Sequence, residues 1–315
     1  MRIGISDVRK WGEEHFARLA AYGFTCYDFN MADTEKLPYT LEDGAFEAYI
    51  KDQKRLADEA GITIWQVHGP WRFPIRDGGE DDRAERLEKM SRSIRAAALL
   101  GAKYWVVHPL MPCGLDDKKT GRAAETRAIN RDFMARLLRV AEAEDVIICL
   151  ENMPFVDFSL STPDEIADFV GEMAHPNFYM CLDTGHVNTG LHWGTPGDAL
   201  RAHRDVIRVL HVHDNMGERD EHLVPTMGTI DWQDFSAALR EVDFSGVLSL
   251  ECGPRAEFPD EALETMYRER IAVARMIGDG KGAINEATDR LNYRRMPPLH
   301  GDGQGGILHP RAFQG

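Results

Sequence analysis

Residues 146–151 read Val-Ile-Ile-Cys-Leu-Glu, an apolar run that ends in a carboxylate. A short continuous apolar run rich in β-branched side chains is typical of a parallel strand that is buried on both faces. Seven other runs of this kind occur along the chain. The eight strands that the sequence predicts are 2–6, 25–29, 63–68, 104–108, 146–151, 179–183, 207–212 and 247–251.

Amphipathic segments separate these runs. Between positions 87 and 97 apolar side chains recur every three or four residues, ahead of Gly101 as a predicted helix C-cap. Residues 162–165, Thr-Pro-Asp-Glu, give the pattern of an N-cap, a first-turn proline and a capping-box glutamate. Eight alternations of strand and helix predict an α/β fold, a (β/α)8 TIM barrel. The competing open sheet commonly carries a Gly-rich dinucleotide-binding turn, and nothing in this sequence resembles one.

The charge of the chain limits its partners. It carries 52 acidic and 37 basic residues among 315, a net charge of −15. Such a surface repels phosphate backbones and anionic membranes, so we expect neither a nucleic-acid nor a membrane partner. The five cysteines form no C-x-x-C pair, which favours reduced thiols. No apolar run is long enough to span a membrane, and the N-terminal MRIGIS is unlike a signal peptide, so a cytoplasmic protein is expected.

The last part of the chain departs from the strand–helix pattern. Residues 278–315 form a Gly/Pro-containing C-terminal extension that includes Gly-Asp-Gly-Gln-Gly-Gly at 301–306. Such a segment is either a flexible tail or an arm that wraps a neighbouring subunit or borders the active site. We therefore predict a catalytic barrel domain over 1–277 and an arm or tail over 278–315. Barrels of this kind commonly pair, so a homo-oligomer is expected.

The residues at the ends of the runs indicate a functional site. From the third run onward they are His68, His108, Glu151, Asp183, His211 and Glu251. In a (β/α)8 barrel the C-terminal strand ends meet at one mouth, where active sites form. Carboxylates gathered there repel one another, so a cation is expected among them. Three carboxylates and an imidazole make a mostly oxygen site that suits Mn²⁺, Mg²⁺ or Co²⁺ as well as Zn²⁺.

Each of these residues also has a purely structural interpretation. Asp183 could cap a helix, and Glu151 or Glu251 could form a structural ion pair. His211 could be a hydrogen-bonded core histidine. His213 lies two residues further along and faces the same way, so the residues alone leave the choice between these two histidines open.

Several longer motifs resemble one known family. They are Leu-Glu-Asn at 150–152, Leu-Asp-Thr-Gly-His at 182–186, His-Val-His-Asp-Asn at 211–215, Asp-Glu-His-Leu at 220–223 and Gly-Thr-Ile-Asp-Trp at 228–232. Over roughly residues 1–277 the chain resembles the xylose-isomerase-like TIM barrels. This superfamily contains sugar phosphate isomerases and epimerases, ketose 3-epimerases, inosose dehydratases and, more distantly, apurinic endonucleases.

The resemblance implies a divalent-metal-dependent isomerase or epimerase that acts on a sugar or sugar derivative. Proton transfer next to a carbonyl would pass through an enediolate that the metal stabilises, with Mn²⁺ as the expected ion. The implied metal ligands are Glu151, Asp183, His211 and Glu251, and Glu151 and Glu251 would also serve as the catalytic acid/base pair. The residues expected to bind substrate are His68, Trp71, His108, Asp157, His186, Arg219 and His222, with Trp71 as a stacking wall unless it belongs to the core.

Three departures from the family pattern leave the substrate open. Pro-Thr-Met-Gly at 225–228 stands where the family usually has Pro-Gly-x-Gly. Asp157 occupies a position where a glutamate is common, six residues after the first metal ligand. Gly217 stands where ketose epimerases carry an arginine, and Arg219 is the nearest arginine.

Other activities fit the same residues. A lyase or dehydratase of the inosose or C-glycoside type would begin with the same proton abstraction. A zinc-dependent phosphodiesterase like the apurinic endonucleases would use the matching positions His68, His108, Glu151, Asp183, His186, His211, Asp220, His222 and Glu251. The acidic charge opposes duplex binding. A non-catalytic barrel is disfavoured because the metal-facing carboxylates are all present.

Overall fold

The computed structural model describes residues 1–280 of the chain except 8–10, 72–78, 190–193 and 255–256. Eight strands form one sheet in which the neighbours are parallel, in the order β7-β6-β5-β4-β3-β2-β1-β8. The strands are β1 (Arg2–Ser6), β2 (Cys26–Asn30), β3 (Thr63–His68), β4 (Tyr104–Val107), β5 (Ile147–Glu151), β6 (Phe178–Asp183), β7 (Ile207–His211) and β8 (Val247–Leu250).

The two edges of this sheet meet. Val212, which follows β7, forms a parallel bridge with Leu250 of β8. The Val212 N–H donates to the Ser249 carbonyl over 2.8 Å, and the Glu251 N–H donates to the Val212 carbonyl over 3.0 Å. The sheet therefore closes into a barrel, and the predicted (β/α)8 TIM-barrel fold is confirmed.

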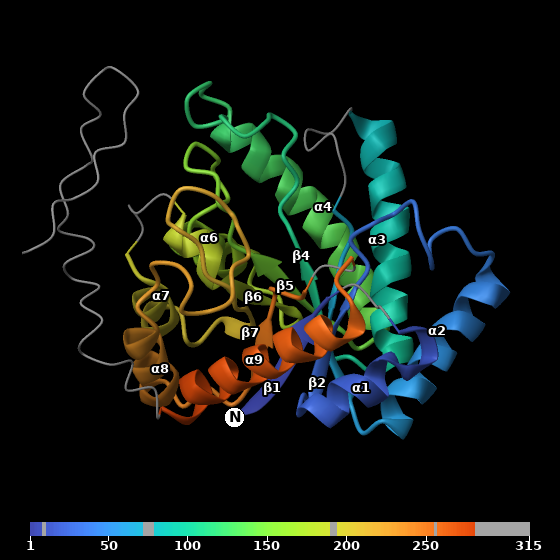
Figure 1. Ribbon diagram of the computed structural model, residues 1–315. Helices are drawn as coiled ribbons and strands as arrows, with labels where there is room; N and C mark the ends of the chain where they lie inside the picture. The colour runs from blue at the N-terminus through green and yellow to red at the C-terminus, as the bar shows by residue number, and fades with distance from the viewer. Residues whose placement is uncertain (8–10, 72–78, 190–193, 255–256, 281–315) are drawn as a thin grey trace, which may run out of the picture. The chain divides into compact units, whose positions relative to one another are not determined.

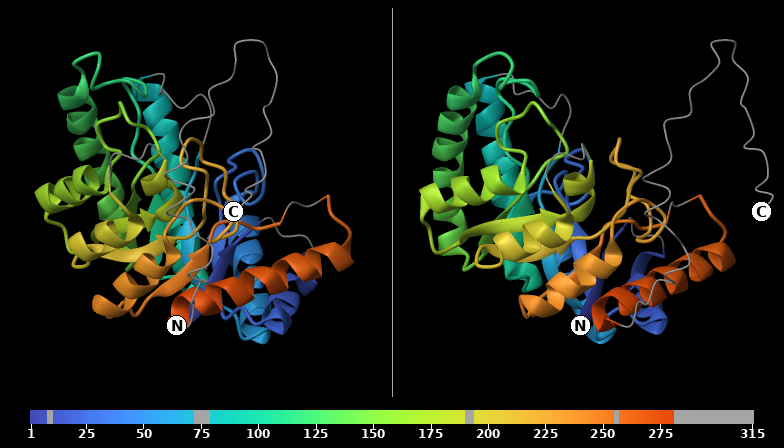
Figure 2. Two further views of the ribbon diagram at one scale, coloured as in Figure 1. Left: turned by 60° about the vertical axis from the view of Figure 1, so that its left-hand side comes forward. Right: turned by 90° about the vertical axis from the view of Figure 1, so that its left-hand side faces the viewer.

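Helices follow the strands and lie outside the ring that the strands form (Figures 1 and 2). Between β1 and α1 lies a short 3-10 helix, Gly12–Glu14. The last helix, α9, packs against β1 and β8, where the two ends of the barrel domain come together. The α-helices are α1 (His15–Tyr22), α2 (Asp43–Glu59), α3 (Glu80–Leu100), α4 (Ala123–Ala143), α5 (Pro163–Met173), α6 (Thr184–Asn188), α7 (Pro196–Ala202), α8 (Trp232–Glu241) and α9 (Asp260–Asp279).

The interior of the barrel is filled in layers, because alternate residues of each strand point to the same side. One layer is apolar and fully buried, and it consists of Val106, Cys149, Cys181 and Val209. Two residues further along three of these strands stand Glu151, Asp183 and His211. The apolar layer is therefore the floor beneath the polar residues at the mouth.

The local sequence signals act as predicted, and each strand starts and ends within one residue of its predicted bounds. Gly101 takes a left-handed conformation with φ of 72° and caps α3. Thr162 accepts a hydrogen bond from the Glu165 N–H while the Glu165 carboxylate accepts one from the Thr162 N–H, so the capping box of α5 is complete. Asp231 caps α8 through the N–H groups of the next helical turn. The loops between strands and helices are therefore anchored at several helix starts.

The predicted division of the chain at residue 277 remains a prediction. Helix α9 ends at Asp279, and the predicted arm or tail lies, from residue 281 onward, outside the described residues. Among the residues that the structure describes, no helix combines the length and apolar character needed to cross a membrane.

The capping box of α5 provides a stability test. Replacing Thr162 by Ala leaves the Glu165 N–H without its acceptor, so the free energy of unfolding should fall by about 1 kcal/mol. Urea denaturation measures this change. The matched control is Thr265→Ala on the exposed face of α9, which should shift stability by less than about 0.5 kcal/mol. Equal losses in both variants would contradict the capping role.

Candidate active site

A cavity of about 220 Å³ lies at the C-terminal ends of the strands. Imidazoles and carboxylates make up much of its described lining, so it suits a small polar molecule. The lining residues are Asn30, Ala32, His68, Trp71, His108, Glu151, Met153, Pro154, Phe155, His186, Asp220, His222 and Glu251.

The four predicted metal ligands come together at the base of this cavity. Each offers one donor atom, and these atoms all lie within 4.8 Å of one another in the group Glu151, Asp183, His211 and Glu251. The first three are the last residues of β5, β6 and β7, and Glu251 directly follows β8. The barrel brings them together because its C-terminal strand ends face one mouth.

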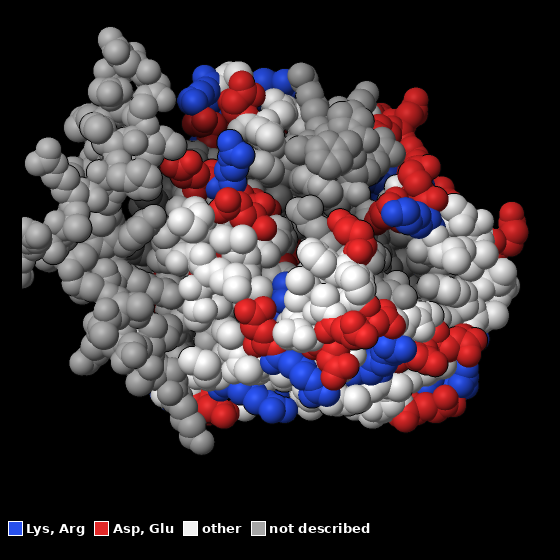
Figure 3. All heavy atoms as spheres, in the orientation of Figure 1, with Lys and Arg blue, Asp and Glu red and all other residues white. Residues whose placement is uncertain are grey.

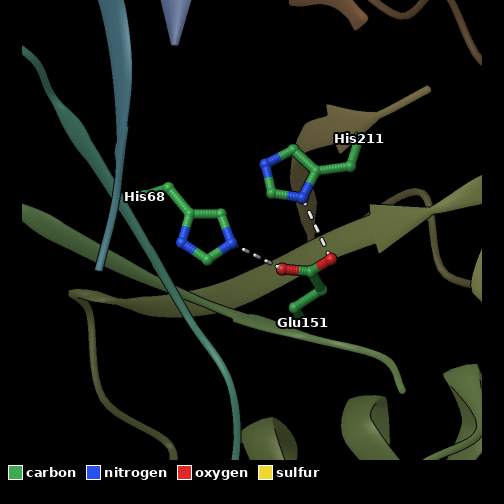
Figure 4. A group of neighbouring side chains, drawn as sticks. All are labelled: His68, Glu151 and His211. Atoms are coloured by element: carbon green, nitrogen blue, oxygen red, sulfur yellow. Dashed lines mark hydrogen bonds and ion pairs between the residues drawn. The ribbon is translucent and has the colours of Figure 1, made fainter. Parts of the chain in front are cut away.

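Glu151 lies between imidazoles on both sides (Figure 4). Its Oε1 is 3.0 Å from Nδ1 of His211, and its Oε2 is 3.8 Å from Nε2 of His68. Nε2 of His108 lies 3.1 Å from the same Oε2. Burial alone would raise the pKa of Glu151, but His211 and His108 hold this pKa well below its ordinary value. The carboxylate is therefore anionic at neutral pH, as a metal ligand or a general base must be.

His211 is fully buried and has carboxylates at both ring nitrogens. Nδ1 lies 3.0 Å from Oε1 of Glu151 and 3.3 Å from Oε2 of Glu251, and Nε2 lies 3.0 Å from Oδ2 of Asp28. Burial opposes the charged ring, but Glu151, Glu251 and the hydrogen bond to Asp28 raise the pKa of His211 well above its ordinary value. An imidazolium thus balances the carboxylates. Once Nδ1 gives up its proton they need another cation, so this donor set fits a divalent metal ion.

Asp183 uses its two oxygens for different purposes. Oδ1 accepts a hydrogen bond of 2.7 Å from the His186 N–H, so the capping role considered for Asp183 is present at the start of α6. Oδ2 lies 3.0 Å from Nε2 of His213. The Asn152 side chain pairs with the Asp183 backbone, accepting from its N–H over 2.8 Å and donating to its carbonyl over 3.1 Å. The end of β6 is therefore held firmly in position.

A second polar group, here called the His213 cluster, adjoins Asp183 and consists of His186, His213, Asp220 and His222. Oδ2 of Asp220 lies 3.3 Å from Nε2 of His186 and 3.1 Å from Nε2 of His222, while Oδ1 lies 3.6 Å from Nε2 of His213. Burial disfavours charge on His186 and His222, but neighbouring carboxylates, Asp220 among them, raise the pKa of each to about 10. Of the two histidines between which the residues alone did not decide, His211 belongs to the four-residue group and His213 belongs to this cluster.

The segment between β7 and α8 carries Asp220 and His222 over the mouth, and Asp214 shapes it. The buried Asp214 carboxylate accepts five hydrogen bonds of 2.8–3.2 Å, from the N–H groups of Asn215, Thr226, Gly228 and Ile230 and from Nε1 of Trp232. A Cβ at Gly228 would lie 2.2 Å from the Asn215 carbonyl oxygen and 2.3 Å from Oδ1 of Asp214. The last residue of the Pro-Thr-Met-Gly motif therefore stands where the loop leaves no room for a side chain.

A family model described as the xylose isomerase-like TIM barrel matches residues 16–275. The chain belongs to this family.

Individual members show the same similarity. A D-psicose 3-epimerase of Enterocloster bolteae is 24% identical over 255 residues, which cover 76% of this chain and 79% of that protein. A 3-dehydro-D-guloside 4-epimerase of Escherichia coli is 24% identical over 228 residues, which cover 71% and 83%. The crystal structure of a D-tagatose 3-epimerase-like protein has a TM-score of 0.71 at 24% identity, over 90% of this chain and all of that one, and so shares the fold.

The remaining residues that the family resemblance singled out lie in different places. Trp71 lines the cavity, and its ring meets His108 edge-on with 4.5 Å between the ring centroids. Asp157 is not part of the described lining, and its Oδ2 forms an ion pair of 2.6 Å with Nζ of Lys119. Arg219 is exposed and is likewise not among the described lining residues. The structure therefore groups the predicted histidines and Trp71, but neither Asp157 nor Arg219, around the cavity.

Asp28 is a contact of the site that does not stand at the end of an apolar run, so the strand-end pattern does not predict it. It lies on β2, is fully buried, and contacts Nε2 of His211 on the side away from Glu151. The available signal was an aspartate inside the otherwise apolar predicted strand 25–29. A charged residue in a strand interior is uncommon unless it has a partner.

The Asp214 network predicts a large stability effect. In Asp214→Asn one end of the side chain becomes an NH₂ group, which would face backbone N–H donors whichever way the amide turns. The free energy of unfolding in urea should fall by roughly 3 kcal/mol. The control is Asp205→Asn, whose side chain is 93% exposed and which should change stability by less than about 0.5 kcal/mol. An Asp214→Asn protein as stable as this control would show that the network does not hold the loop.

Proposed function

We propose that this protein is a divalent-metal-dependent epimerase or isomerase that moves a proton next to the carbonyl of a sugar or sugar derivative. The observation that carries the proposal is the pair of glutamates, Glu151 and Glu251, both facing Nδ1 of His211 at the base of a small polar cavity. The names of two relatives, a D-psicose 3-epimerase and a 3-dehydro-D-guloside 4-epimerase, support the same class of reaction.

Glu151, Asp183, His211 and Glu251 would hold the metal, with Mn²⁺ as the expected ion and Mg²⁺, Co²⁺ or Zn²⁺ as alternatives. A divalent ion bound there supplies Lewis acidity, which polarises a sugar carbonyl and makes the neighbouring C–H more acidic. The apolar layer beneath the group and the burial of three of the four residues keep water away from it. Exclusion of water strengthens the electrostatic interactions on which such a step depends.

The two glutamates would act as the acid/base pair. Their strands, β5 and β8, are not neighbours in the barrel, so their carboxylates reach the cavity from different sides. One carboxylate removes the proton from the carbon beside the carbonyl, and the other returns a proton to the opposite face or to the adjacent carbon. Return to the opposite face gives an epimer, and return to the adjacent carbon gives an isomer.

The histidines that line the cavity would hold the sugar hydroxyls. His68 and His108 stand on one side of Glu151, and His186 and His222 belong to the His213 cluster. Imidazole nitrogens donate or accept hydrogen bonds, which suits hydroxyl groups that do both. Trp71 adds an apolar wall of the kind on which a sugar ring packs.

A lyase or dehydratase of the inosose or C-glycoside type would share the first proton transfer. The difference lies in the substrate, because a leaving group next to the carbanion is expelled before a proton returns. Product analysis separates the two outcomes, since an epimerase conserves the mass of its substrate and a dehydratase loses one water.

One observation favours a second candidate, a zinc-dependent phosphodiesterase. The His213 cluster adjoins the four-residue group through Asp183 and offers ligands for further ions. The net charge of −15 opposes binding to a nucleic acid, and basic side chains on the face drawn in Figure 3 lie among acidic ones. Metal stoichiometry is the discriminating measurement, because one ion favours the sugar reaction and three zinc ions favour the phosphodiesterase.

The acid/base roles predict the outcome of two isosteric substitutions. Turnover would be assayed with Mn²⁺ against free sugars, sugar phosphates and inososes. Glu151→Gln and Glu251→Gln should each lower kcat by about 10² to 10⁴-fold, because an amide cannot accept the proton. Glu142→Gln on the exposed face of α4 is the control and should keep full activity. Unchanged turnover in either active-site variant would refute its acid/base role.

Metal binding should also stabilise the folded protein. Mn²⁺ at one hundred times its Kd should add about 2.7 kcal/mol to the free energy of unfolding, since the unfolded chain lacks the grouped ligands. Excess chelator should reverse this gain and abolish turnover, and fresh Mn²⁺ should restore both. In Asp183→Asn the metal-dependent rise in melting temperature should shrink or disappear. If no divalent ion changed the melting temperature of the wild-type protein, the proposed metal site would be wrong.

A further inference from the structure

We infer that Asp28 is a positioning residue for the metal site, because its carboxylate holds the His211 ring so that the Nδ1 lone pair faces Glu151, Asp183 and Glu251. This inference rests on the proposed function. It assigns a role to a side chain that lies neither in the cavity lining nor among the four proposed ligands.

The geometry of the His211 ring supports this role. Nε2 lies 3.0 Å from Oδ2 of Asp28, and Nδ1 lies 3.0 Å from Oε1 of Glu151 on the opposite edge of the ring. An imidazole that binds a metal through one nitrogen carries its proton on the other. A hydrogen bond from Nε2–H to Asp28 keeps the proton on Nε2. The lone pair is therefore on Nδ1, the nitrogen next to the glutamates. Carboxylates that accept from a metal-binding histidine in this way fix its orientation and increase its basicity.

Gln66 on β3 fixes Asp28 in turn. Its Nε2 lies 2.9 Å from Oδ2 of Asp28 and 3.4 Å from the Leu210 carbonyl oxygen. Both of these atoms are acceptors, so the amide nitrogen is the donor to both. Oδ2 of Asp28 thus accepts a hydrogen bond from Nε2 of Gln66 and also contacts Nε2 of His211. Three strands, β2, β3 and β7, take part in this chain of contacts across the barrel interior.

The needs of folding alone do not explain Asp28. The side chain is fully buried, and its Oδ1 has no hydrogen-bond partner among the described residues. Burying a carboxylate with one unsatisfied oxygen costs free energy that an apolar side chain would not. The cost is offset if the charge serves His211, and a group that breaks a folding rule next to a candidate active site is expected to have a functional role.

Direct measurement of metal affinity tests the inference. Mn²⁺ and Zn²⁺ would be titrated into the chelator-treated wild type and the isosteric Asp28→Asn variant in competition with a chromophoric chelator. We expect a 10- to 100-fold weaker affinity in the variant, because a neutral amide oxygen accepts the Nε2 proton more weakly than a carboxylate and does less to increase the basicity of the ring. The visible absorption spectrum of the Co²⁺ form should change as well, which loss of stability alone would not cause.

Two further variants keep the test decisive. Asp117→Asn removes another fully buried carboxylate, one that accepts from Ser159 away from the site, and should leave metal affinity within about twofold of the wild type. Gln66→Met removes the donor to Asp28, together with the longer hydrogen bond to the Leu210 carbonyl, and should weaken affinity several-fold. This variant covers the case in which Asp28→Asn does not fold. Equal affinity of wild type and Asp28→Asn, or of wild type and Gln66→Met if only that variant folds, would overturn the inference while leaving the proposed function intact. A wild type that binds no divalent ion would overturn both.

Discussion

The mutual repulsion of carboxylates in a confined space is the constraint on which the candidate active site depends. Barrel closure brings Glu151, Asp183 and Glu251 to one point, and burial removes most of the water that would otherwise screen them. Among the described residues, imidazoles reduce this repulsion, above all His211, whose Nδ1 faces both glutamates. Under the proposed function, the same arrangement would bind a divalent cation in place of the proton. Folding stability and metal binding would then depend on the same electrostatic balance.

The structure divides the mouth into a rigid part and a loop-borne part. The four-residue group stands at strand ends above the apolar floor, and the Asn152 amide fixes the Asp183 backbone. Three of the four residues of the His213 cluster, His213, Asp220 and His222, instead lie on the segment between β7 and α8, which Asp214 holds through five hydrogen bonds. Residues on strand ends are positioned more precisely than residues on loops. We therefore propose that the first group carries the chemistry and that the second contributes, with His68 and His108, to substrate recognition.

Much of this could be predicted from the sequence because strands have a strict two-residue period. The end of each apolar run marks the last residue of a strand, and closure of the barrel brings these last residues together at one mouth. Glu151 and His211 are examples. Loop residues follow no such period. The family pattern predicts Asp157 and Arg219 from their spacing along loops, and neither lines the described cavity. To predict Asp28 as a contact of His211, one must know which face of β2 points toward β7. The sequence does not show this, because the register of the β2–β3 pairing shifts between residues 27 and 28.

Anomalous diffraction at the manganese absorption edge, from crystals grown with Mn²⁺, tests the central claim most directly. The account predicts one strong anomalous peak among the donor atoms of Glu151, Asp183, His211 and Glu251, with Nδ1 of His211 as the nitrogen ligand. A map with no peak between these four side chains, or with manganese only elsewhere on the molecule, would contradict it.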